Sequence, residues 1–164
     1  MKRSLLFIAI CFLLCSCATA PVAPPTGSIE KKHTVAVWDL ENLSPLGTAQ
    51  MDLGDLLSAR IIETVQQGGY TTIEREKLEI ALRELNLGSS SLADSSTQLR
   101  IGRIAGASRM IFGAYQVVGN QMRLDLRLVD VETGRILKSA EKTAGDGDLS
   151  GWLKAAEAAA KELL

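Results

Sequence analysis

The chain has 164 residues, a formal net charge of −1, one histidine and three cysteines. Without a cluster of lysine and arginine it is a poor nucleic-acid binder, and it lacks the basic patch that holds proteins on anionic lipid. The single histidine, His33, has no second metal ligand nearby and cannot complete a Ser-His-Asp set. We therefore expect no enzymatic activity, no cofactor, no metal and no small-molecule substrate.

The first 16 residues have the pattern of a bacterial lipoprotein signal peptide. Lys2 and Arg3 precede an unbroken apolar run that ends at residues 14–17, LCSC. A small residue before a cysteine at this distance from a basic start is typical of a cleavage site. The resemblance implies that Cys17 becomes the lipid-modified first residue of the mature chain. Loss of the two basic residues would take the formal charge from −1 to about −3.

Two alternatives to lipidation are open for this segment. A membrane-spanning anchor needs roughly 20 apolar residues, and the run from Ser4 to Cys15 is shorter. Ordinary secretion would cut the chain near Ala18 or Ala20, but a serine directly before Cys17 favours lipidation. Ala18 stands where many inner-membrane lipoproteins carry aspartate, so the resemblance implies the periplasmic face of the outer membrane.

Residues 17–32 are expected to be the lipidated cysteine and a linker, and residues 33–164 the folded domain. The linker is rich in proline, glycine and serine and has no apolar periodicity, so we expect it to be extended and disordered. At about 3.1 Å per residue it reaches at most roughly 50 Å. The remaining stretch of about 130 residues is long enough for one compact domain with its own core.

This domain is predicted to be α/β (α+β), with a mixed sheet of about five strands and about four packed helices. Strands are expected where β-branched residues alternate or turn signals bound an apolar run: residues 33–39, 70–73, 109–118, 121–131 and 135–142. Helices are expected where apolar residues recur three or four apart: from Ser44-Pro45 or Thr48 to Gly68-Gly69, over 74–87 with Gly88 at its end, over 95–105, and after 145–148. Ser95 and Gln98 resemble a capping box for the third helix.

The predicted hairpin around Gly119-Asn120 separates two kinds of side chain. Along its return strand Met122, Leu124, Leu126 and Leu128 face one way, and Arg123, Asp125 and Arg127 face the other. One side of this sheet is therefore expected to be solvated or lightly covered, with Arg127 as a residue for interaction.

Charged residues follow the first two predicted strands. Glu74 and Arg75 begin a helix directly after a strand. They are either complements of the helix dipole and ion-pair partners, or Arg75 is a structural latch or a contact for a partner protein. Asp39 and Glu41 follow the first strand and are either turn residues or part of a site at the end of the sheet.

Trp38 lies in the first predicted strand, where it alternates with Val37. An indole at such a position is most often a core residue, and a role at an interface is the alternative.

Four blocks of sequence carry a family resemblance. They are residues 35–42 (VAVWDLEN), 69–78 (GYTTIEREKL), 106–114 (GASRMIFGA) and 126–136 (LRLVDVETGRI). In this order they resemble the CsgG/HfaB family of outer-membrane lipoproteins, which implies its periplasmic fold. That family builds a secretion pore from two long membrane-crossing hairpins. Here one of these connections is reduced to Gly119-Asn120, and residues 144–148 leave no room for the other, so we expect a short form without the pore.

The resemblance implies a lipid-anchored periplasmic scaffold or accessory component of envelope assembly or secretion. Its partners would be the membrane, through the lipid anchor, and envelope proteins, with a homo-oligomer left open. The alternative is a regulator that docks on an envelope enzyme, similar to the lipoproteins that activate penicillin-binding proteins. A reach of roughly 50 Å argues against this alternative unless the enzyme lies near the anchoring membrane.

Overall fold

The computed structural model describes residues 33–45, 53–85, 94–145 and 148–164. The predicted signal peptide, the lipidation site at Cys17, the linker, and the predicted helix boundaries at Thr48 and Gly88 lie outside these residues.

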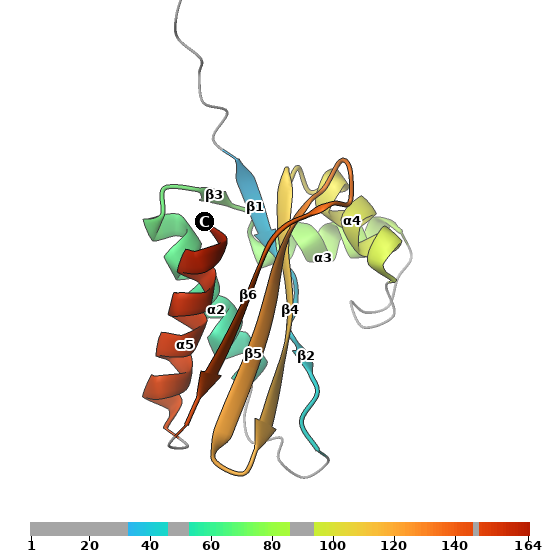
Figure 1. Ribbon diagram of the computed structural model, residues 1–164. Helices are drawn as coiled ribbons and strands as arrows, with labels where there is room; N and C mark the ends of the chain where they lie inside the picture. Colours follow the sequence, from blue (N-terminus) through green and yellow to red (C-terminus); the bar gives the residue numbers. More distant parts are fainter. Residues whose placement is uncertain (1–32, 46–52, 86–93, 146–147) are drawn as a thin grey trace, which may run out of the picture. The chain divides into compact units, whose positions relative to one another are not determined.

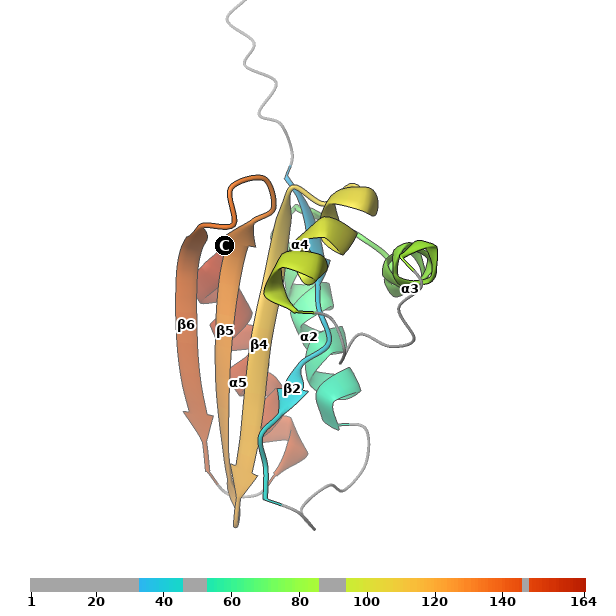
Figure 2. The same ribbon diagram turned by 90° about the vertical axis from the view of Figure 1, so that its right-hand side faces the viewer.

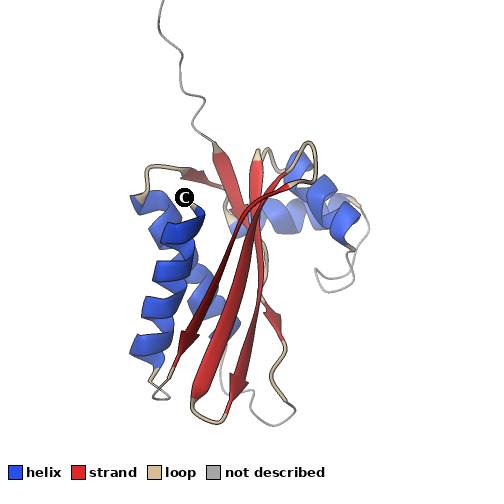
Figure 3. Cartoon of the chain, viewed as in Figure 1, coloured by secondary structure: helices blue, strands red, loops and turns tan. Residues whose placement is uncertain are grey.

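The strands form one mixed sheet, as the sequence predicts (Figures 1 and 3). They are β1 (Thr34–Val37), β2 (Glu41–Asn42), β3 (Thr71–Thr72), β4 (Arg109–Val118), β5 (Gln121–Asp130) and β6 (Ile136–Ala144). The order is β3-β1-β4-β5-β6, and β2 also pairs with β4. β1 is parallel to β3 and β4, whereas β4, β5 and β6 form an antiparallel meander. The expected two-residue turn joins β4 to β5.

The described helices lie on the two faces of this sheet. They are α2 (Leu53–Gln67), α3 (Arg75–Glu84), α4 (Ser95–Ile104) and α5 (Leu149–Leu163). In Figures 1 and 2, α2 and α5 cover one face and α3 and α4 lie on the other, toward β1 and β4. None of these four is both long and apolar enough to cross a membrane.

The larger core lies between the sheet and the pair α2–α5. The four leucine and methionine residues predicted to share one side of β5 are buried in it, and so are the apolar residues of α2 that recur four apart. These are Leu53, Leu57, Ile61 and Val65 from α2, and Met122, Leu124, Leu126 and Leu128 from β5. Small alanines of α5, among them Ala156 and Ala160, complete the cluster and let the helix approach the sheet closely.

A smaller core lies beneath α3 and α4. Trp38 is 6% exposed there, and its ring lies 6.4 Å from that of Phe112 at an angle of 49°. Val129 of β5 faces this second cluster, because it alternates with Leu128, which faces the larger core. A Cβ on Gly102 of α4 would overlap Sδ of Met110, so this glycine allows α4 to pack tightly on β4.

Two local predictions were wrong. The third helix is capped by Asp94, whose carboxylate accepts the backbone N–H of Thr97 at 2.7 Å; Ser95 is instead the first helical residue. Ser44 does not open a helix, because its hydroxyl accepts the backbone N–H of Val117 at 2.9 Å. It thereby continues the contact of β2 with β4.

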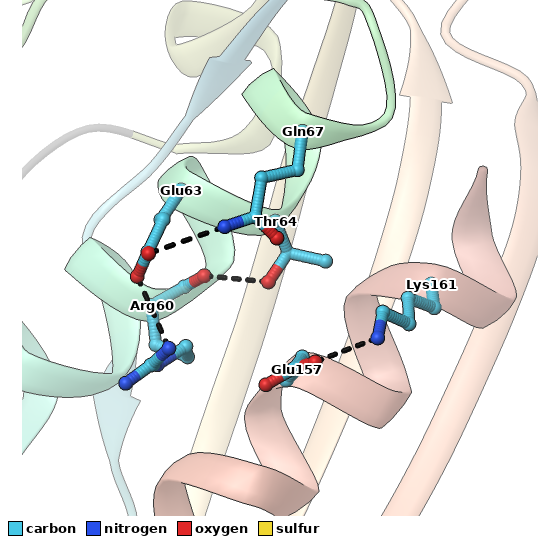
Figure 4. A network of polar contacts seen from close by, with 6 residues as sticks. All are labelled: Arg60, Glu63, Thr64, Gln67, Glu157 and Lys161. Atoms are coloured by element: carbon cyan, nitrogen blue, oxygen red, sulfur yellow. Dashed lines mark hydrogen bonds and ion pairs between the residues drawn. The ribbon is translucent and has the colours of Figure 1, made fainter.

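The outward faces of α2 and α5 satisfy their own polar groups (Figure 4). Arg60 pairs with Glu63 at 3.1 Å, and Lys161 pairs with Glu157 at 2.6 Å. The hydrogen bond from Lys161, together with the positive charge of Arg60, lowers the pKa of Glu157 below its ordinary value. Thr64 is buried, and its hydroxyl donates to the backbone carbonyl of Arg60. These exposed faces are therefore typical of solvated helices.

Candidate interaction surfaces

The face of β5 and β6 opposite α2 and α5 is largely uncovered. Figure 2 looks onto this face and shows α3 and α4 gathered over β1 and β4, with no helix in front of most of β5 and β6. The side chains here alternate with the buried ones of the larger core: Arg123 and Arg127 are exposed, and Asp125 is half-buried. We call this surface, made of Arg123, Asp125 and Arg127 of β5 and Ser139 and Glu141 of β6, the open sheet face.

One end of the open sheet face is an ion-pair network. Asp125 and Glu141 lie directly opposite each other on neighbouring strands, an arrangement that repels when nothing neutralises it. Arg123 bridges the two and reduces their repulsion, because its Nε lies 2.9 Å from Asp125 and its Nη2 lies 3.0 Å from Glu141. The hydrogen bond to Asp125 raises the pKa of Arg123 above its ordinary value.

Arg127 lies at the other end of this face. Its neighbours across the sheet are Phe112 on β4 and Ser139 on β6. Neither neighbour carries a carboxylate, and Arg127 forms no ion pair within the described residues. An exposed guanidinium without a carboxylate partner keeps its forked set of donors available to a second molecule.

A second polar cluster surrounds Arg75, at the end of the sheet where β1 stops. Its Nη1 donates to Asp55 of α2 at 2.8 Å, and its Nη2 lies 3.1 Å from Asp39, which follows β1. Its Nε lies 3.7 Å from Glu79, one turn further along α3. The structure thus links the starts of α2 and α3 to the end of β1 through one side chain.

The neighbouring carboxylates also set the pKa of Arg75. The hydrogen bond to Asp55, followed by the charges of Asp39 and Glu79, raises the pKa of Arg75 above its ordinary value. Arg75 is half-exposed, so these ion pairs add little to stability individually. Glu74 caps α3 without a side-chain hydrogen bond and is exposed, and it is not among the carboxylates that contact Arg75 in the described structure.

The remaining residues singled out in the sequence belong to neither surface as defined above. Trp38 is buried against Phe112, which supports the core interpretation over the interface one. His33 is exposed, with Nδ1 3.5 Å from the hydroxyl of Ser108. Glu41 is exposed in β2. In the described part of the chain, no three histidine, cysteine, aspartate or glutamate side chains are grouped so that they could hold a metal ion.

Sequence reasoning missed several members of these surfaces. Asp55 and Glu79 join Arg75 from positions 20 residues before it and one helical turn after it. The contact of Arg75 with Glu79 could be predicted from their i to i+4 spacing on a helix. The contact with Asp55 could not, because it depends on how α2 and α3 pack together. Glu141 belongs to the open sheet face only because β6 pairs with β5 in one particular register.

The family follows from comparison of the whole chain. The model that describes the FlgO protein family matches residues 25–148, which is most of the sequence. The chain belongs to the FlgO protein family. The resemblance to the CsgG/HfaB family was therefore wrong. The first of its four blocks overlaps β1, the second includes β3 and the start of α3, the third overlaps β4, and the fourth overlaps β5. The blocks therefore describe strands and helix ends of the fold. The comparison with curated proteins gave no match.

Solved structures share the fold of this FlgO family member. The C-terminal domain of LpoB from Salmonella enterica superposes with a TM-score of 0.60 at 21% identity, covering 70% of this chain and 84% of that one. Lipoprotein GNA1162 from Neisseria meningitidis gives a TM-score of 0.58 at 17% identity, over 71% and 82% of the two chains. A PelC dodecamer from Paraburkholderia phytofirmans gives 0.50 at 19% identity, over 80% and 87%.

Proposed function

We propose that this FlgO family member is a non-catalytic accessory protein of the bacterial envelope that works by binding another envelope protein. Lipidated Cys17 anchors it to the periplasmic face of the outer membrane, and residues 33–164 bind the partner. The observation that carries the proposal is the open sheet face, where Arg127 is exposed without an ion pair in the described structure.

The chemistry of this face specifies the kind of partner. Arg127 binds a carboxylate best, because a guanidinium donates two parallel hydrogen bonds to it. Ser139 beside it offers a hydroxyl that donates or accepts a hydrogen bond. Arg123 bridges Asp125 and Glu141 and offsets one of their two negative charges, which weakens the repulsion that a carboxylate-bearing partner would otherwise meet. We therefore expect the partner to be a protein whose docking surface has an exposed aspartate or glutamate at its centre.

Between the two functions that the sequence suggests, the second is the better supported. A scaffold or accessory component of the CsgG/HfaB type, without the pore, rested on the CsgG/HfaB resemblance, which the FlgO match overturns. A regulator that docks on an envelope enzyme needs only a folded domain, a tether and a binding face. The fold shared with the LpoB domain and with lipoprotein GNA1162 supports this choice. The linker requires that the enzyme present its docking surface within roughly 50 Å of the anchoring membrane.

The test is site-specific photo-cross-linking in cells that express the full chain. A photoreactive amino acid replaces Ser139 on the open sheet face, and, as the matched control, Lys154 on the outward side of α5. We expect a covalent product with one envelope protein from position 139 and none from position 154. Equal products from both positions, or none from 139, would refute docking on this face.

A further inference from the structure

In the described structure, α3 and α4 line a groove. It has a volume of about 300 Å³ and is lined by Lys77, Ile80, Ala81, Glu84, Ile104 and Ala105. Ile80 on α3 and Ile104 on α4 are each 45% exposed. Two large apolar side chains on adjoining helices give a patch that water solvates poorly, and such patches are typical of interaction sites.

The charges of this groove are placed symmetrically along α3. Lys77 and Glu84 both line it and are exposed. Seven residues separate them, which is about two helical turns or roughly 10 Å. Neither forms an ion pair with another described residue. The point midway between them falls between Ile80 and Ala81, at the apolar centre of the groove.

We propose that this groove binds a second copy of the same chain, with the two α3 helices packed antiparallel about a two-fold axis. The axis passes between Ile80 and Ala81, so Lys77 of each copy lies opposite Glu84 of the other. A two-fold contact repeats every interaction twice, and both ion pairs form at once. Parallel packing would instead place Lys77 against Lys77 and Glu84 against Glu84. Charge therefore selects the antiparallel arrangement.

Apolar packing completes the contact. Each α3 lies over the hollow between α3 and α4 of the other copy, so Ile104 contacts the incoming helix from the side. Ile80 and Ile104 of each copy, both 45% exposed, supply the apolar contact, and Ala81, which is 1% exposed, forms the floor of the hollow beneath the incoming helix. The contact uses none of the residues of the open sheet face, so it goes beyond the proposed function and is tested independently of it.

The first test locates the contact. The photoreactive residue is placed at Ile80 in the full chain expressed in cells, and at Leu149 of α5 as a control that is also apolar and 41% exposed. We expect a product of twice the chain mass from position 80 and none from position 149. A cross-link from position 80 exclusively to a different protein, or no product at all, would overturn the proposal.

The second test uses charge reversal with the photoreactive residue kept at position 80. Lys77→Glu and Glu84→Lys should each reduce the doubled product roughly tenfold, because each replaces two attractions by two repulsions. The double variant K77E/E84K should restore it to within about twofold, because the swapped charges again face opposite signs. Lys154→Glu should change nothing. Failure of the double variant to restore the product would contradict the antiparallel two-fold contact.

Discussion

Gly113 of β4 lies against β5 with no room for a side chain. A Cβ added there would lie 2.5 Å from Cδ2 of Leu126 and 2.7 Å from the backbone oxygen of Asp125. Leu126 is buried, and the oxygen belongs to the sheet itself, so neither can move away without disturbing β5. This glycine is therefore required by packing.

We expect Gly113→Ala to lower the free energy of unfolding by about 2 kcal/mol, the usual cost of overpacking a tight core. Denaturant titration of the purified chain measures this. Gly145→Ala is the control, since its added Cβ meets nothing within 4 Å, and we expect it to change stability by less than about 0.5 kcal/mol. Equal effects of the two substitutions would show that the space around Gly113 is not limiting.

Arg75 is a second single residue that we expect to contribute to stability, in this case through its charge. Its guanidinium is 51% exposed and bridges Asp39, Asp55 and Glu79. Arg75→Gln should lower the free energy of unfolding by about 0.5–1 kcal/mol in dilute buffer, the range for exposed networks. In about 1 M salt the loss should shrink, because the Debye length falls to about 3 Å. Lys154→Gln should have no effect at either salt concentration. A loss that does not depend on salt would contradict the latch.

At the scale of elements, the long periodic segments and the short β3 were predictable from sequence, and β2 was not. The alternation of β5 placed four apolar and three charged residues on their correct sides, and the burial of α2 follows its four-residue repeat. β2 has only two residues, Glu41 and Asn42, and pairs with β4 more than 70 positions away in sequence, at Ala114 and Tyr115. Unlike the threonines of β3, Glu41 and Asn42 are not β-branched, so no local pattern reveals this strand.

The caps show a related limit. Asp94 and Ser95 are both good capping residues, and the sequence does not say which adopts the extended backbone that the cap requires. The structure gives that role to Asp94, with φ −68° and ψ 167°. Likewise Arg127 could be assigned to the solvated side of β5 from sequence, whereas its lack of a partner depends on the β5–β6 register that gives Glu141 to Arg123.

The cap of α4 also predicts a dependence on pH. The hydrogen bond from the backbone N–H of Thr97 lowers the pKa of Asp94 below its ordinary value, which for aspartate is about 3.9. A lowered pKa in the folded chain means that the contribution of Asp94 to stability is complete above that ordinary value. It is then lost as the pH falls through the lowered pKa.

We therefore expect Asp94→Ala to be less stable than the parent chain at pH 6, with a difference that shrinks steadily as the pH falls below about 4. Urea unfolding midpoints of both proteins, measured across this range, test the expectation. Glu132→Ala, at an exposed position, serves as the control and should follow the parent chain throughout. A constant difference between Asp94→Ala and the parent would show that the charge of Asp94 does not stabilise the cap.

For the whole molecule, the mixed sheet and its helices could be predicted from sequence, and the family could not. The four blocks that suggested the CsgG/HfaB family lie on strands and helix ends that belong to the fold. The same fold occurs in LpoB and in lipoprotein GNA1162 at 21% and 17% identity. Blocks of this kind therefore report architecture, and the FlgO match over residues 25–148 was needed to assign the family.

The proposed anchor makes a prediction at this scale. Cys17→Ala removes the only cysteine that would remain after signal cleavage, so the variant should leave the membrane fraction and take up no labelled fatty acid. Cell fractionation and metabolic labelling measure both. Cys11→Ala should behave as the parent chain, because Cys11 would be removed with the signal peptide. Continued labelling and membrane retention of the Cys17 variant would rule out lipidation at this residue.

The central claim is that the chain acts by binding a partner through Arg127 on the open sheet face. Its most direct test is the affinity of the partner identified by cross-linking for the purified full-length chain. Arg127→Glu should raise the Kd at least roughly tenfold, because it replaces an attraction to a carboxylate by a repulsion. Lys154→Glu should leave the Kd within about twofold, and both variants should unfold like the parent chain. Unchanged affinity of the Arg127→Glu variant would contradict the account.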